Sequence, residues 1–406
     1  MFRGLSFKWV FWGILLAALL LRIGYVITLD QHTITYWDDQ GWEIAKNMVE
    51  GNGYKMSWIA DVYSARPPVF PLFLFGIFSI FGQSLLIVRI FLAICNSLIC
   101  VAVYFLAKEM FDRKVALLAM AITAVFPSVV YWSGYISQET LTTLFFTTVL
   151  IFIFKIKQKP LFYSLLSGLA LGMLVMTRSL AYGILPIIFI WLYVNIKSKK
   201  KAFISVCLIS LMVMLLITPW VARNFIRHHG LLITSTEGGL TFYLANNPEV
   251  LIKGGGDTYM PDNFTKGTES MPEIEKDRYF LKKGIEFVKT YPRMYIRLVL
   301  ERFIRFWRFY PHITGAIDSH KPIHLIIMFF TDTPLILLGF FGLIAYFRDD
   351  KERAVLLALL FLYFTIIAML IYSCIRYRAP LLPLLIILSS FFIVSKLKKL
   401  RILRNV

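Results

Sequence analysis

Long apolar runs recur along the chain and are separated by short polar connections. A helix needs roughly 20 apolar residues to cross about 30 Å of hydrocarbon. Runs close to that length cover residues 9–29, 85–107, 115–132, 138–154, 161–177, 180–196, 202–219, 323–346, 354–373 and 379–395. The pattern therefore predicts an all-α polytopic membrane protein with about ten transmembrane helices.

One further apolar stretch, residues 67–82, is short and contains three prolines. If it is a re-entrant or interfacial helix, every short basic connection falls on one side of the membrane. These connections are residues 108–114, 155–159, 197–201, 348–353 and the tail 396–404. The positive-inside rule favours this count and predicts cytoplasmic N- and C-termini. The sequence thus indicates a multi-pass protein of the cytoplasmic (inner) membrane.

Two long connections, residues 30–66 and 220–322, then lie on the outer face, which in a bacterium is periplasmic or exterior. The chain divides accordingly into three parts. Residues 1–219 form an N-terminal transmembrane module, 220–322 an outer region, and 323–406 the C-terminal helices with a basic tail. Within the outer region an amphipathic pattern runs from Glu273 to Phe309 and breaks near Pro292, which predicts a helix lying in the membrane interface.

Composition excludes a soluble enzyme. Hydrophobic residues make up 58% of the chain and charged residues 17%, against roughly 45–50% and about 25% in soluble domains. The net charge of +19 follows the cytoplasmic connections, so no nucleic-acid partner is expected. Four cysteines lie in apolar stretches without metal-ligand spacing, which implies neither disulfides nor zinc: Cys95, Cys100, Cys207 and Cys374.

Ionisable residues collect at the predicted outer face. They are Asp38, Asp39, Arg66, Glu139, Arg178, Arg223, Arg376 and Arg378. Each has an ordinary alternative, because an arginine can reach the headgroups, a glutamate can favour a helix start and two aspartates can form a solvated turn. Together they predict a pocket for an anionic group with a carboxylate beside it, since charges at membrane depth usually serve a site.

A sugar linked to a polyprenyl phosphate fits such a pocket. Its leaving group is already an anion, so it needs cations rather than a general acid. The acceptor hydroxyl must lose a proton as it attacks the anomeric carbon, and a carboxylate on the opposite face, for which Asp38 is the candidate, favours inversion. Trp42, Tyr54, Trp58 and Tyr63 in the same loop either stack on sugars or belong to the aromatic interfacial belt.

The segment YWDDQGWEIAKNMVEGNGY followed by ARPPVFP resembles the first outer loop of a known family. The family comprises the GT-C membrane glycosyltransferases of the protein mannosyltransferase and aminoarabinose transferase type, glycosyltransferase family 39 and its relatives. The matching residues are Asp38, Trp42, Ala45, Gly51 to Tyr54, and Arg66 with Pro67 and Pro68. SGYISQET, TPWVARNFIRHHGLLITSTEGGLTFYLANNP and RYRAPLLP resemble later segments of the family in the same order.

The resemblance implies a GT-C fold, a polyprenyl-phosphate sugar donor and inverting transfer on the outer face. Carried over by position, Asp38 is the catalytic carboxylate, Glu139 the second acid and Arg66 a contact to the lipid phosphate. Side and charge alone suggest phosphate binding by Arg178, Arg223, Arg376 and Arg378. Sugar or acceptor contacts are expected at Trp42, Tyr54, Tyr63, Asn246 and Asn247.

Two departures bear on the chemistry. The second acid is commonly aspartate, so Glu139 reaches further than its counterpart. Asp39 lies beside Asp38, so binding of a divalent cation by this pair is not excluded. The resemblance itself implies catalysis without metal or other cofactor.

The predicted activity is therefore transfer of a sugar to a glycan, lipid or protein acceptor. Two alternatives remain at this stage. One is a surface-polysaccharide polymerase or ligase that uses a diphosphate-linked donor. The other is a transporter of a lipid-linked glycan, which needs polar residues through the middle of the spans, where they are scarce.

Overall fold

The computed structural model describes residues 7–31, 40–57, 62–250, 252, 258–262, 264–309 and 322–404. Across these ranges the protein is helical, and the one extended pairing is a bridge between Met56 and Val62. The N-terminal module contains α1 (Phe7–Ile27), α2 (Gly41–Val49), α3 (Val69–Phe81), α4 (Leu85–Met110), α5 (Arg113–Val125), α6 (Pro127–Ser133), α7 (Glu139–Lys155), α8 (Pro160–Val175), η1 (Ser179–Gly183), α9 (Ile184–Asn195) and α10 (Lys199–His228). The remainder contains α11 (Gly238–Ala245), α12 (Glu273–Thr290), α13 (Pro292–Trp307), α14 (Pro322–Asp349), α15 (Lys351–Leu370), η2 (Ile375–Leu381) and α16 (Leu382–Arg404).

The prediction of an all-α polytopic membrane protein is confirmed. Within the described ranges, six helices are long and apolar enough to cross a bilayer: Phe7–Ile27, Leu85–Met110, Lys199–His228, Ile326–Asp349, Lys351–Leu370 and Ile375–Lys398. Shorter apolar helices lie at Val69–Phe81, Pro160–Val175 and Ser179–Asn195. The expected stretch 67–82 is helix α3, whose 13 residues span about 20 Å and fall short of the hydrocarbon thickness.

Helix boundaries differ from expectation in two places. The run 115–132 is not one helix, because Phe126 is extended and separates α5 from α6. A residue before proline disfavours the helical conformation, and Pro127 follows Phe126. Conversely, α10 continues past Pro219 to His228, nine residues beyond the predicted end. The short helices α2 and α11 were not predicted.

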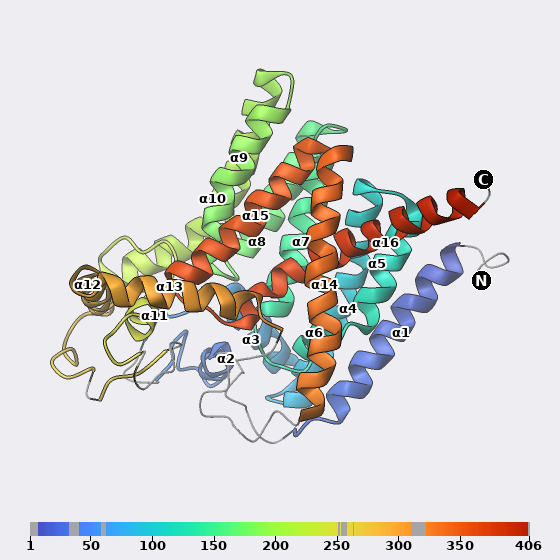
Figure 1. Cartoon of the computed structure of the whole chain (residues 1–406). Coiled ribbons are helices and arrows are strands. Elements are labelled where there is room, and N and C mark those ends of the chain that lie inside the picture. The colour runs from blue at the N-terminus through green and yellow to red at the C-terminus, as the bar shows by residue number, and fades with distance from the viewer. Residues whose placement is uncertain are drawn as a thin grey trace.

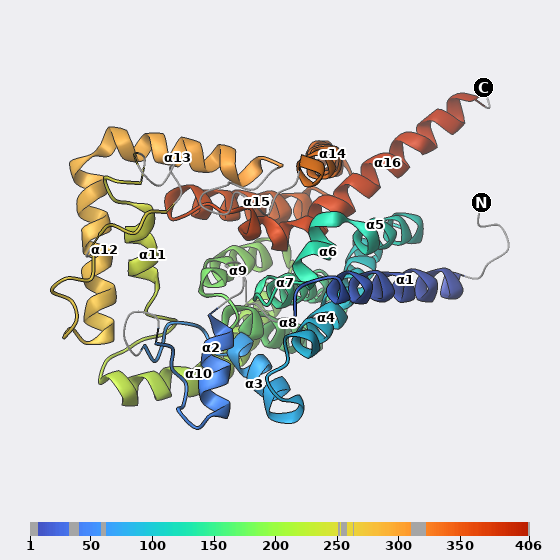
Figure 2. The same ribbon diagram turned by 90° about the horizontal axis from the view of Figure 1, so that it is seen from below.

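The basic connections lie at one end of the molecule, as charge distribution predicts. Three ion pairs join them: Lys157 Nζ to Glu352 Oε2 at 2.5 Å, Arg353 Nη2 to Glu109 Oε1 at 3.4 Å, and Lys398 Nζ to Asp112 Oδ2 at 2.9 Å. The N-terminal and C-terminal helices also begin and end on the same side of the molecule (Figure 1). Helices α2, α11, α12 and α13 gather on the side away from both termini (Figure 2).

Buried charge ties the first helix into the bundle. Arg22 of α1 is fully buried and donates to Asn96 Oδ1 at 2.7 Å and to the carbonyl oxygens of Ala124 and Thr123 at 2.8 and 3.0 Å. Because its donors find acceptors on α4 and α5, Arg22 is a structural residue rather than one that reaches for headgroups.

Helix α13 has two unlike faces. Leu298, Arg302, Arg305 and Phe306 are buried, whereas Ile296, Leu300, Phe303 and Ile304 are exposed. Arg302 donates to the carbonyl oxygens of Ala245 and Met369, which joins α13 to α11 and α15. The exposed apolar face suits the predicted interfacial position, which remains a prediction.

Helices α11 and α12 are in close contact at Gly239. Its N–H donates to Asp277 Oδ1 at 2.7 Å, and a Cβ at this position would lie 1.9 Å from the Asp277 carbonyl oxygen. Burial raises the pKa of the Asp277 carboxyl above its ordinary value, while N–H donors of Gly239 and Leu240 act in the opposite direction. The contact fixes the start of α11 beside the first two turns of α12.

Glycines also allow α14 to approach α16. A Cβ at Gly342 would lie 2.1 Å from the carbonyl oxygen of Leu388. We therefore expect Gly342→Ala to lower the free energy of unfolding by about 1–3 kcal/mol, since a packed interface resists added volume. Gly76→Ala in α3 is the control, because no atom lies within 4 Å of its Cβ position. Thermal unfolding in detergent measures both, and equal midpoints would contradict the packing.

Candidate active site

Glu139 begins helix α7 and is almost completely buried. Its Oε1 lies 3.2 Å from Arg178 Nη1 and 3.9 Å from Arg376 Nε. The ring of Tyr377 lies beside both guanidinium groups, with its centroid 4.2 Å from Arg178 Cζ and 5.7 Å from Arg376 Cζ. The fold thus brings together three predicted residues from the start of α7, the end of α8 and η2.

Two polar atoms in this cluster lack hydrogen-bond partners among the described residues. Glu139 Oε2 and Arg376 Nε are buried and make no hydrogen bond to any described residue. A buried carboxylate oxygen without a donor is costly, and such groups are uncommon outside functional sites. The cluster is therefore suited to a ligand that donates a hydroxyl to Glu139 Oε2 and presents negative charge to the two arginines.

Arg66 lies in a second polar contact, beside the start of α2. Its Nη1 is 2.6 Å from Glu237 Oε2, and its Nη2 donates to Gln40 Oε1 at 3.0 Å. Asp38 and Asp39 directly precede Gln40 in the chain and lie outside the described residues, so their predicted roles stay predictions. Glu237 was not predicted: it lies inside the matched segment, between the Arg-Asn and Asn-Asn-Pro positions, and has no motif of its own.

The segment Thr234 to Glu237 links the two contacts. Ser235 Oγ lies 3.4 Å from Ser179 Oγ, next in the chain to Arg178, and Thr236 N donates to the Ser64 carbonyl oxygen at 3.0 Å. Through Glu237 the same segment reaches Arg66. The Glu139 cluster and the Arg66 contact are therefore connected through one short stretch of outer loop.

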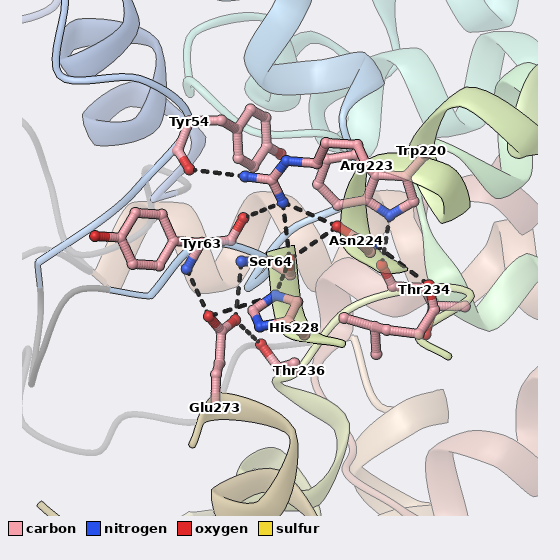
Figure 3. A network of polar contacts seen from close by, with 11 residues as sticks. Tyr54, Tyr63, Ser64, Trp220, Arg223, Asn224, His228, Thr234, Thr236 and Glu273 are labelled. Carbon is pink, nitrogen blue, oxygen red and sulfur yellow. Dashed lines mark hydrogen bonds and ion pairs between the residues drawn. The ribbon is translucent and has the colours of Figure 1, made fainter. Parts of the chain in front are cut away.

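Arg223 supports the first outer loop from α10 (Figure 3). Its Nη1 donates to the Tyr63 carbonyl oxygen at 2.7 Å and to Ser64 Oγ at 2.9 Å, and its Nη2 donates to the Tyr54 carbonyl oxygen at 3.2 Å. The guanidinium also lies 5.0 Å from the Trp220 ring centroid. The structure thus gives Arg223 a role in holding the loop, and its predicted contact to phosphate stays a prediction.

Glu273, the first residue of α12, binds the same loop from the other side (Figure 3). Its two carboxylate oxygens accept hydrogen bonds from the N–H groups of Tyr63 and Ser64, each at 2.8 Å, and from the Thr236 hydroxyl. His228 Nε2 lies 2.8 Å from Ser64 Oγ and 3.8 Å from Glu273 Oε2. The sequence shows Glu273 only as an acid in the first turn of a helix, so its partners could not be foreseen.

The predicted aromatic contacts have structural partners of their own. Tyr54 donates its hydroxyl to the Arg66 carbonyl oxygen at 2.8 Å, and its ring packs edge-on against Trp220 at 5.1 Å. Trp42 of α2 packs on Phe78 of α3 at 4.5 Å. These contacts anchor the loop and α2, and the predicted contacts of both side chains to sugar or acceptor stay predictions.

Arg378 lies apart from the Glu139 cluster. Its Nη1 donates to the carbonyl oxygens of Phe306 and Arg308, both at 2.9 Å, and its Nη2 lies 3.2 Å from Asp332 Oδ1. Both charged side chains are 1% exposed. A side chain that is enclosed in this way stabilises the end of α13, and its predicted phosphate contact stays a prediction.

Asn246 and Asn247 are also structural. Asn246 Nδ2 donates to the Phe242 carbonyl oxygen at 2.8 Å, and its Oδ1 accepts from Arg302 at 3.2 Å. Asn247 Nδ2 donates to the carbonyl oxygens of Tyr243 and Tyr259, both at 3.1 Å. Both are fully buried and fix the end of α11. Their predicted contacts to sugar or acceptor stay predictions.

No group of three or more His, Cys, Asp or Glu side chains that could hold a metal ion occurs among the described residues. Asp38 and Asp39, where a divalent cation was left open, lie outside them.

Comparison with known proteins extends this description. Residues 65–222 match the family described as dolichyl-phosphate-mannose-protein mannosyltransferase, a range that contains Arg66, Glu139 and Arg178. The oligosaccharyltransferase of Archaeoglobus fulgidus in the apo form superposes with a TM-score of 0.60 at 13% identity, covering 98% of this chain and 52% of that chain. The chain has the GT-C fold. The resemblance seen in the sequence is thereby confirmed.

Further structures of GT-C proteins are similar to the chain. Archaeal oligosaccharyltransferase AglB from the same organism, in complex with an inhibitory peptide and a dolichol-phosphate, gives a TM-score of 0.60 at 14% identity over 98% of this chain and 52% of that chain. The chain spans about half the length of this oligosaccharyltransferase. ArnT from Cupriavidus metallidurans bound to undecaprenyl phosphate gives 0.49 at 10% identity, over 97% and 79%. No curated protein matches the chain in sequence.

The two-sided support of the first outer loop can be tested by amide hydrogen exchange. We expect Glu273→Ala to increase exchange of the Tyr63 and Ser64 amides by about tenfold or more, since each loses a hydrogen bond to a charged acceptor. Glu275→Ala, in the same first turn but exposed, is the matched control. Unchanged protection in Glu273→Ala would show that Arg223 alone holds the loop.

Proposed function

We propose that this protein is an inverting glycosyltransferase that moves a sugar from a polyprenyl-phosphate donor to a glycan, lipid or protein acceptor on the outer face of the cytoplasmic membrane. The observation that carries the proposal is the buried Glu139 carboxylate between Arg178 and Arg376, with one oxygen left without a donor among the described residues. The GT-C fold and the mannosyltransferase match over residues 65–222 support the reaction class.

The arginines supply what the leaving group requires. As the bond between the anomeric carbon and the phosphate oxygen breaks, its electron pair stays on the phosphate, so negative charge increases there. Fixed guanidinium groups stabilise that charge without reorganising. Arg178 and Arg376 are assigned to this role, and Arg66 joins them from the loop that begins with Asp38.

The carboxylates act on the acceptor. Its hydroxyl oxygen forms the new bond to the anomeric carbon from the face opposite the phosphate, and Asp38 takes the proton. Attack from that face inverts the configuration. Glu139 Oε2 accepts a hydrogen bond from a second hydroxyl of the sugar or acceptor, which orients that group for attack.

The topology agrees with this placement. The connections tied by Lys157, Arg353 and Lys398 form the basic, cytoplasmic end. We assign the start of α1 and the end of α16 to that end, so that the Glu139 cluster faces the periplasm or exterior. The dolichol-phosphate bound by the related AglB supports a lipid phosphate as the donor's carrier.

The deciding experiment is release of free polyprenyl phosphate from a panel of polyprenyl-phosphate sugars. Purified protein in lipid is incubated with envelope glycans as acceptors, with wild type beside Asp38→Asn. Release that depends on one sugar and on the acceptor identifies both donor and reaction. Release from diphosphate-linked donors alone would indicate the polymerase or ligase instead, and movement of an intact lipid-linked glycan across vesicles without release would indicate a transporter.

Variants separate the two carboxylates. We expect Asp38→Asn to lower kcat by about 10²–10⁴-fold with little change in KM, because it removes the base. Glu139→Gln retains the side-chain shape but loses the charge between the arginines, so KM for the acceptor is expected to rise severalfold as kcat falls. Initial rates at varied acceptor concentration measure both, with Glu50→Gln, an exposed acid in the same loop, as control. Full activity of Asp38→Asn would exclude it as the base.

A further inference from the structure

A groove of about 340 Å³ lies between three helices of the N-terminal module, away from the Glu139 side chain. It is lined by Pro68, Val69 and Leu72 of α3 and its start, Met173 and Met176 of α8 and its end, and Leu216, Pro219, Trp220 and Arg223 of α10, with Tyr54 from the first outer loop. Most of these side chains are apolar. The groove therefore favours hydrocarbon over water or a polar ligand.

The groove is continuous with a surface that faces lipid. Leu72 on its wall is 46% exposed, and Leu215, next in the chain to the wall residue Leu216 of α10, is 58% exposed. These leucines belong to apolar helices, and α10 is long and apolar enough to cross the bilayer. Since lipid is the solvent for such a surface, an acyl chain is the hydrocarbon that reaches the groove.

One cation lies beyond the groove on the same face of α10. Pro219, Arg223 and Arg227 are spaced at four-residue intervals, which places them along one side of the helix, with Arg227 about 12 Å beyond Pro219. Arg223 is occupied by loop carbonyls, but Arg227 is exposed, lies 3.7 Å above the Tyr63 ring, and forms no ion pair with any described residue.

The surroundings of Arg227 are those of a membrane interface. Phe225 and Ile226 are 56% and 74% exposed, and Leu231 follows at 64%. Apolar side chains beside an exposed guanidinium at the end of a spanning helix match the boundary where acyl chains meet headgroups. An anionic headgroup is attracted to a basic side chain there, whereas a zwitterionic one is not attracted as a whole.

We propose that this groove binds one acyl chain of an anionic bilayer phospholipid, whose phosphate lies against Arg227. The chain occupies the space between Leu72, Met173 and Leu216. Because Tyr54 and Pro68 form part of the wall, the bound lipid presses the first outer loop and the start of α3 against α10. The lipid is a structural ligand of the loop, distinct from the donor of the proposed reaction.

The test uses phosphatidylglycerol with a photoreactive diazirine on one acyl chain, added to purified full-length protein in neutral phosphatidylcholine vesicles. Labelled residues are located by mass spectrometry. We expect labels on Leu216, Met173 and neighbouring groove residues, displaced more strongly by unlabelled phosphatidylglycerol than by added phosphatidylcholine. Labelling spread evenly over exposed helix faces such as that of α1 would overturn the site.

Three variants sharpen the result. Leu72→Trp fills the groove from an already exposed position, and Ile80→Trp, 76% exposed on the same helix and outside the groove, is its matched control. We expect the first to reduce labelling severalfold and the second to leave it unchanged. Arg227→Gln should weaken the preference for phosphatidylglycerol by about fivefold without removing the label from the groove.

Other outcomes contradict the proposal directly. Equal labelling of the two tryptophan variants would show that the acyl chain does not enter the groove. Equal competition by the two lipids would show that the groove does not prefer an anionic headgroup. Displacement by polyprenyl phosphate alone would assign the groove to a prenyl chain. Because the readout is labelling rather than sugar transfer, failure here leaves the proposed glycosyltransferase activity untouched.

Discussion

The described part of the first outer loop after α2, residues 50–57 and 62–66, contains one β-bridge and no helix, so its buried backbone groups must be satisfied by side chains from elsewhere. Arg223 donates hydrogen bonds to the carbonyl oxygens of Tyr54 and Tyr63. Glu273 accepts hydrogen bonds from the N–H groups of Tyr63 and Ser64. A cation on α10 and an anion on α12 thus hold opposite sides of one short segment. Arg66 lies two residues beyond Ser64, so its position depends on this support. The ion pair between Arg66 and Glu237, which links Arg66 to the rest of the site, depends on it as well.

Five arginines of this fold belong to two groups that differ in what their side chains contact. Arg22, Arg302 and Arg378 direct their donors to backbone carbonyl oxygens or to a buried acid, and each thereby joins helices. Arg178 and Arg376 instead surround a carboxylate that retains an unpartnered oxygen. The unpartnered oxygen of Glu139, rather than the depth of the arginines, therefore distinguishes the cluster available to a ligand from the structural cations.

The sequence predicts the helices well because a bilayer imposes a length and a polarity that apolar runs reveal directly. The sequence predicts helix ends and side-chain roles less well where contacts with residues distant in the chain determine them. The break at Phe126 follows from the proline that comes next, so it could have been predicted from the sequence. The extension of α10 past Pro219, in contrast, depends on contacts with residues more than 150 positions away. Glu139, Arg178 and Arg376 were foreseen as one-sided charges. The structural roles of Arg378, Asn246 and Asn247 were not predicted, because the sequence does not show which backbone carbonyl group a side chain will contact.

Helix α10 connects the two ends of the molecule without interruption. Its 30 residues give a rod of about 45 Å, longer than the hydrocarbon layer by about 15 Å. The excess emerges on the side that carries Trp220, Arg223 and His228, the residues that hold the outer loop. The height of the loop above the bilayer is thus set by a helix anchored in lipid. In the proposed reaction, this height defines how far from the membrane surface the acceptor presents its hydroxyl.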